Sequence, residues 1–104
     1  MRFDTVIRNG TVVTVSDTFV CDVGIKNGRI AALATGLTDA DDVIDATGLF
    51  VLPGGIDSHV HLDQPSGECI VMADDFDSGT CSAAIGGTST VLAFCMQEKG
   101  QSLR

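Results

Sequence analysis

One segment divides this chain of 104 residues into two unlike halves: PGGIDSHVHLD, residues Pro53–Asp63. Its proline cannot donate a hydrogen bond to a β-ladder, and its glycines accept backbone dihedrals that other residues avoid. We therefore expect a boundary here, with one domain over residues 1–52 and a second over residues 53–104. Within the segment, Ile56–Leu62 predicts a β-strand.

The two histidines of the chain both lie in this segment, at His59 and His61. Side chains alternate between the faces of a strand, so both imidazoles are expected to share one face with Asp57 and Asp63. Their Cα atoms would be about 6.5–7 Å apart, which lets two ring nitrogens converge on one divalent ion. Asp57 is placed to accept the other ring N–H of a histidine or to add an oxygen ligand. His59 and His61 are therefore predicted metal ligands, with the remaining ligands supplied from elsewhere.

Before this segment, short apolar runs alternate with turn residues. Asn9-Gly10 and Asn27-Gly28 each predict a β-hairpin, because both residue types tolerate the positive φ of a type I′ turn. The runs together predict an antiparallel sheet or half of a β-sandwich. The expected strands are Phe3–Ile7, Thr11–Val15, Phe19–Ile25, Arg29–Ala34, Val43–Asp45 and Leu49–Leu52.

After the segment, the pattern changes to strand, helix and strand. A helix is expected over Ala73–Ile85, with Asp74 and Asp75 at its positive N-terminal end and Gly86-Gly87 as its C-terminal stop. Thr88–Met96 contains a continuous apolar run, which is typical of a buried parallel strand. A βαβ unit is therefore predicted. Because a two-stranded parallel sheet cannot bury both of its faces, we expect the chain to be the opening part of a longer protein.

Composition and charge argue against several classes of partner and compartment. Six basic and fourteen acidic residues give a net charge of −8, whereas nucleic acids and anionic membranes require clustered Lys and Arg. No run approaches the roughly 20 apolar residues of a membrane span, and no secretory signal is recognisable. The cysteines form no Cys-x-x-Cys pair, which argues against a zinc knuckle and favours reduced thiols in the cytoplasm. They are Cys21, Cys69, Cys81 and Cys95.

Motifs along nearly the whole chain carry a family resemblance. The most specific is the block GGIDSHVH, Gly54–His61, and five weaker blocks stand in register with it. Together they resemble the opening of the cyclic amidohydrolases, in particular the dihydropyrimidinase and hydantoinase group. The resemblance implies an α/β fold: the N-terminal part of a small β-sandwich, followed by the first βαβ unit of a metal-dependent (β/α)₈ barrel. The weaker blocks are Ile7–Gly10, Asp22–Ile30, Val43–Gly48, Ala73–Phe76 and Gly86–Thr90.

The resemblance also implies a hydrolase that opens a dihydropyrimidine or hydantoin ring at its C–N bond and yields an N-carbamoyl amino acid. His59 and His61 would bind the more buried of two Zn²⁺ ions. In the family, a carboxylated lysine, two further histidines and a proton-shuttling aspartate lie on later strands, so this chain contains no catalytic residue and is expected to be inactive alone. The loop with Asp63 and Gln64 is expected to line the substrate pocket. A full-length parent is expected to be a dimer or tetramer of identical subunits.

Other members of the same superfamily remain alternatives. An allantoinase-like enzyme fits the same motifs. A dihydroorotase-like enzyme ranks lower, because an arginine that would hold the substrate carboxylate is expected shortly after the second histidine, where this chain has Leu62-Asp63. A non-catalytic, dihydropyrimidinase-related assembly protein is the third alternative, against which the retention of both histidines argues.

Overall fold

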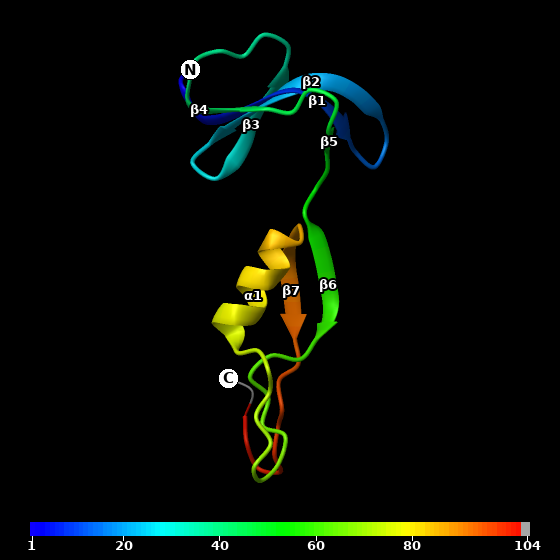
Figure 1. Ribbon diagram of the computed structural model, residues 1–104, viewed down its shortest axis with the longest axis vertical. Coiled ribbons are helices and arrows are strands. Elements are labelled where there is room, and N and C mark those ends of the chain that lie inside the picture. Colours follow the sequence, from blue (N-terminus) through cyan, green and yellow to red (C-terminus); the bar gives the residue numbers. More distant parts are fainter. Residues whose placement is uncertain (103–104) are drawn as a thin grey trace. The chain divides into compact units, whose positions relative to one another are not determined.

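The structure is a computed structural model that describes residues 1–102, and the chain forms two compact units (Figure 1). The first unit is Met1–Pro53, and the second begins at Gly54. Residues 103 and 104, the last two of the second predicted domain, lie outside the described residues. In the described part of the chain most elements are strands, and no helix is long and apolar enough to cross a membrane.

The first unit is a mixed sheet of five strands: β1 (Phe3–Val13), β2 (Thr18–Lys26), β3 (Arg29–Ala34), β4 (Ala40–Asp45) and β5 (Phe50–Val51). The order is β3-β2-β1-β4, with β5 also paired to β1. β2 is antiparallel to β1 and β3, whereas β4 and β5 are parallel to β1. The predicted antiparallel sheet is therefore wrong for β4 and β5. The segment after β3 returns the chain to the start of β1, so that β4 runs parallel to β1. The local alternation of apolar and polar residues does not specify such a long-range crossover.

The predicted hairpin at Asn9-Gly10 is also wrong, because β1 continues through it. The register of β1 against β2 shifts between Ile7 and Gly10, so that two residues of β1 oppose Asp22 alone. Asn9 has a φ of 59°, and its N–H donates to the Asp22 carboxylate at 2.9 Å. Asn9 and Gly10 are therefore part of a β-bulge. A residue with left-handed backbone occurs both in turns and in bulges, and the pairing with β2 makes this one a bulge.

The second Asn-Gly pair forms the predicted hairpin. Asn27 and Gly28 have φ values of 51° and 68° and connect β2 to β3, with Lys26 opposite Arg29. Both residues are left-handed, as a type I′ turn requires.

The core of the first unit is built mainly from β1 and β2. Val12, Cys21 and Val23 form its buried cluster, and Val6 is fully buried. Phe3 is buried as well, and its ring occupies the space above Gly24 that a side chain would fill.

The second unit contains β6 (Gly55–Val60), α1 (Phe76–Ile85) and β7 (Thr88–Ala93), and β6 is parallel to β7 (Figure 1). The predicted order of strand, helix and strand is confirmed. The helix begins three residues later than predicted, because Asp75 is its N-cap: the Asp75 carboxylate accepts from the N–H of Ser78, and the Ser78 hydroxyl accepts from the N–H of Asp75.

The two parallel strands expose apolar side chains within the described residues, as expected for a two-stranded parallel sheet that cannot bury both of its faces. Ile56 on β6 is 70% exposed and Leu92 on β7 is 53% exposed. One short helix has too little surface to cover a parallel sheet, whose two faces both require a covering layer. The unit thus presents apolar strand surface that a larger fold would bury.

Candidate metal centre

The two histidines converge where β6 ends. His59 is in the strand, and His61 follows its last residue, Val60. Their Nε2 atoms lie 3.3 Å apart, and their ring centroids are separated by 5.3 Å. Two nitrogens that each lie about 2.0–2.1 Å from one tetrahedral ion would be about 3.3–3.4 Å apart. The pair therefore has the separation that Zn²⁺ or a similar ion requires. In residues 1–102 no third His, Cys, Asp or Glu joins it to form a three-ligand group.

The second ring nitrogen of His61 has its own partner. Its Nδ1 is hydrogen-bonded to Oε1 of Gln64, three residues further along the chain. A carbonyl oxygen can only accept, so Nδ1 carries the proton and the neutral ring keeps a lone pair on Nε2. This arrangement suits a metal ligand, because ligating histidines usually donate their other N–H to a fixed acceptor.

Phe94, the residue after β7, supports both imidazole rings. It stacks on His61 with centroids 4.5 Å apart and meets His59 at 4.6 Å with a tilt of 55°. Its N–H donates to the carbonyl of Val60 at 3.0 Å, so the pairing of the strands places it there. This role of Phe94 was not predicted from the sequence. A local signal for it is absent, because only the parallel register brings the end of β7 beside the end of β6.

Asp57 lies on β6 and binds the main chain. Its carboxylate accepts from the backbone N–H of His59 at 3.0 Å. This contact fixes the backbone at the first histidine, and it differs from the expected contact with a ring N–H. Asp63 does not continue the alternation of the strand, because β6 ends at Val60 and Asp63 has a φ of 47°.

The loop that follows His61 contacts α1 and the residues just before that helix. The Leu62 side chain is 5% exposed and lies against Gly79 of α1, where an added methyl group would overlap it. The N–H of Asp63 donates to the carbonyl of Asp74 at 3.1 Å. These contacts turn the chain sharply after His61, so that Gln64 folds back onto the imidazole.

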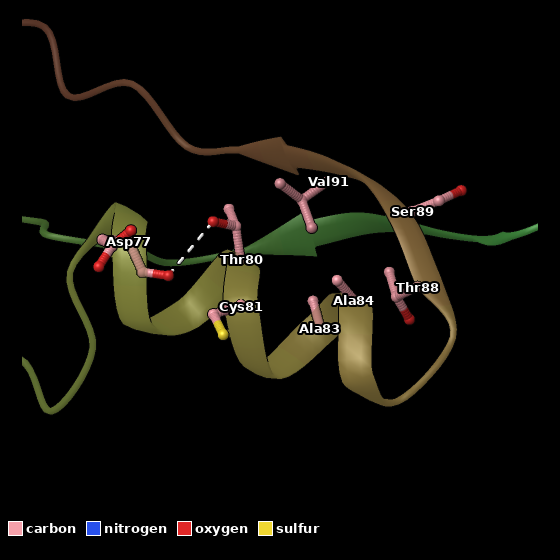
Figure 2. A pocket seen from close by; sticks show the side chains of 8 residues that line it. All are labelled: Asp77, Thr80, Cys81, Ala83, Ala84, Thr88, Ser89 and Val91. Atoms are coloured by element: carbon pink, nitrogen blue, oxygen red, sulfur yellow. Dashed lines mark hydrogen bonds between the residues drawn. The ribbon is translucent and has the colours of Figure 1, made fainter. Parts of the chain in front are cut away.

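Among the described residues of the second unit, hollows lie in the loop after β6 and beside α1. One, of roughly 190 Å³, is in the loop and is lined in part by Asp63 and Gln64, the two residues expected at a substrate pocket. The other, of roughly 450 Å³, lies between α1 and β7 and contains no predicted site residue (Figure 2). Among its lining residues, the hydroxyl of Thr80 donates to the carbonyls of Phe76 and Asp77 within the helix.

Comparisons with known proteins find relatives over nearly the whole chain. No family model matches the chain. The D-hydantoinase of Geobacillus stearothermophilus is 48% identical over 99 residues, which cover 94% of this chain and 21% of that protein. An allantoinase of Escherichia coli is 41% identical over 92 residues, 88% of this chain and 20% of the relative. The crystal structure of dihydropyrimidinase from Brevibacillus agri has a TM-score of 0.86 and 52% identity, covering 95% of this chain and 22% of its own.

The chain spans about a fifth of the length of the relatives that it matches. Over that length the identity is high, and it includes both the strand-rich unit and the strand-helix-strand unit that carries the histidines. The chain belongs to the hydantoinase and dihydropyrimidinase group of cyclic amidohydrolases.

Proposed function

We propose that this chain supplies two metal ligands, His59 and His61, to a hydrolase that opens a cyclic amide ring. The observation that carries the proposal is the 3.3 Å separation of the two Nε2 atoms, in a chain related to proteins named D-hydantoinase. The substrate class is a dihydropyrimidine or a hydantoin. Water adds its oxygen to the carbonyl carbon, the ring C–N bond breaks, the leaving nitrogen takes a proton, and an N-carbamoyl amino acid results.

The donor set suits a divalent metal such as Zn²⁺, which imidazole nitrogens bind readily. We place His59 and His61 on one ion of a pair of Zn²⁺, with the bridging carboxylated lysine, the further histidines and the proton-shuttling aspartate contributed by residues outside this chain. When bound, such a pair lowers the pKa of water and polarises the amide carbonyl. No residue of this chain transfers a proton in this reaction, and we expect the 104 residues alone to be inactive.

The residues of this chain orient the ligands. The Asp57 carboxylate holds the backbone N–H of His59, and Gln64 and Phe94 hold the ring of His61. Asp63 and Gln64 line the hollow in the loop, and we assign this loop to one wall of the substrate pocket.

We assign the second unit to the beginning of a (β/α)₈ barrel and the first unit to part of a small β-sandwich. The parallel pairing of β6 with β7 and the helix between them support the barrel, because barrel strands are parallel and each is followed by a helix. The exposed apolar surface of Ile56 and Leu92 supports a fold in which further strands and helices cover both. Catalytic sites of such barrels lie at the C-terminal ends of the strands, where His59 and His61 stand.

An allantoinase activity is the second candidate, because the allantoinase of Escherichia coli is 41% identical to this chain. Allantoin contains a hydantoin ring, so the same bond would be hydrolysed and only the substituent on the ring would differ. For the parent protein we further propose a cytoplasmic location, supported by four free cysteines, and a homo-oligomeric state.

The experiment uses the full polypeptide that carries this chain. His59→Ala and His61→Ala are each expected to lose bound metal and ring opening, whereas Ser58→Ala, directly before His59 on the other face of β6, retains both. Metal content and turnover are measured on dihydrouracil, hydantoin and allantoin, which separates the two candidate activities. Full metal content and full turnover in both histidine variants would contradict the proposal.

A further inference from the structure

We infer that Gln64 is a positioning residue that sets the tautomer of His61, an assignment that rests on the proposed role of His61 as a metal ligand. The side chain of Gln64 presents its carbonyl oxygen to Nδ1 of His61. Because that oxygen has no proton to give, the hydrogen bond forms only when Nδ1 is protonated. The lone pair is thereby kept on Nε2, the atom that faces Nε2 of His59 at 3.3 Å.

The ring of His61 is fixed in two independent ways. Phe94 stacks on its face with a plane angle of 2°, which restrains tilting of the imidazole. Gln64 holds one edge of the ring, which sets its rotation within that plane. With the face and the edge both restrained, the Nε2 lone pair keeps one direction, and a ligand whose direction is set in advance loses less freedom when metal binds.

Gln64 is itself held by its surroundings. It is half-buried, its N–H donates to Sδ of Met72 at 3.2 Å, and its carbonyl accepts from the hydroxyl of Ser66 at 3.0 Å. The backbone of Gln64 is thus bound on both sides, and only its side-chain oxygen is directed to the histidine. Gln64, which was expected from the sequence only in the wall of a substrate pocket, thus also orients His61.

The first test is metal affinity in the full polypeptide, measured by competition with a chelator. Gln64→Leu removes the acceptor and is expected to weaken Zn²⁺ binding by about 10- to 100-fold, the usual effect of losing a partner of a ligating histidine. Gln64→Glu keeps an acceptor oxygen and is expected to bind Zn²⁺ with an affinity close to that of the wild type. Ser66→Ala is the matched control: it loosens the same loop without touching the ring, and its affinity should equal that of the wild type. Unchanged affinity in Gln64→Leu, or an equal loss in Ser66→Ala, would overturn the inference.

The second test reads the tautomer directly. In the full polypeptide prepared without metal, the ¹⁵N signals of the His61 ring are identified as those missing from the spectrum of histidine-labelled His61→Ala. We expect the proton of neutral His61 on Nδ1 in the wild type and a shift of its population to Nε2 in Gln64→Leu. A wild-type His61 protonated on Nε2 would refute the role of Gln64. If the wild-type protein binds no metal, the proposed function fails instead, and these spectra still decide the tautomer.

Discussion

The phenyl ring of Phe94 lies flat against the imidazole of His61, with ring centroids 4.5 Å apart and planes 2° apart. The two residues are far apart in sequence, and the pairing of two parallel strands brings them together. The N–H of Phe94 donates to the carbonyl of Val60, so the same hydrogen bond that extends the ladder places the aromatic ring. One side chain at the end of β7 therefore restrains a candidate ligand that follows β6.

Replacing Phe94 by leucine is expected to weaken metal binding by about two- to tenfold, because an aromatic pair contributes about 0.5–1.5 kcal/mol beyond its buried area. Chelator competition on the full polypeptide measures the change. Phe76→Leu is the matched control, since Phe76 is similarly exposed at the start of α1. Equal affinities for Phe94→Leu and the wild type would show that the stacking does not hold His61.

Loss of the Leu62 side chain is expected to loosen the loop behind His61. Leu62 is buried against α1, and Leu→Ala at such a position costs about 2 kcal/mol or more. Leu62→Ala should lower both the free energy of unfolding and the affinity for metal, because Gln64 and His61 flank the loosened residue. Leu52→Ala, at an exposed leucine of the first unit, should leave metal affinity unchanged. A stable Leu62→Ala protein with wild-type affinity would rule out this support.

Asp22 is expected to be essential to the first unit. Asp22 is 4% exposed, and its carboxylate accepts hydrogen bonds from the N–H groups of Asn9 and Leu37, both at 2.9 Å. Asp22→Ala would leave those donors without their partner, at a cost of about 1–3 kcal/mol for a buried group. Urea unfolding of the chain measures the loss, with the exposed Asp42→Ala as control. Equal stability of the two variants would contradict the prediction.

The stability of the chain should also depend on the protonation of Asp22. Hydrogen bonds from the N–H of Asn9 and then of Leu37, together with the charge of Arg8, lower the pKa of Asp22, while burial opposes them. A carboxylate with a lowered pKa in the folded state stabilises the fold above its unfolded pKa of about 3.9, and the stabilisation is lost as the pH falls through the folded value. Unfolding measured from pH 6 to pH 2 should show this loss below about pH 4. Asp22→Asn should reduce this loss of stability at low pH. A pH profile of Asp22→Asn identical to that of the wild type would contradict the prediction.

Gly24 is expected to tolerate no side chain while Phe3 keeps its ring. A Cβ at Gly24 would lie 2.6–2.9 Å from three ring atoms of Phe3, which is itself buried. Gly24→Ala should therefore destabilise the chain by about 1–3 kcal/mol. Adding Phe3→Leu should recover part of that loss, because the smaller side chain removes the overlap and the two effects are then not additive. Strictly additive losses would show that the overlap is not the cause.

Local chemistry predicted several features of the fold correctly. Asn27-Gly28 formed its hairpin, and Asp75 capped the helix. Each depends on residues adjacent in the chain, so the information is present in a short window. The Asn9-Gly10 bulge and the parallel β4 were missed because both depend on the strand that lies alongside, and that strand is chosen by long-range contacts.

The sequence by itself predicted that two imidazoles, two residues apart at the end of a strand, could meet one ion, because the alternation of a strand is a local property of the backbone. The tertiary structure alone decided what holds those rings. Phe94 reaches His61 only through the register of β6 against β7, and Gln64 reaches it only because Leu62 is buried on α1 and Asp63 turns the chain back. Such contacts depend on the packing of segments distant in the sequence, which local propensity does not specify.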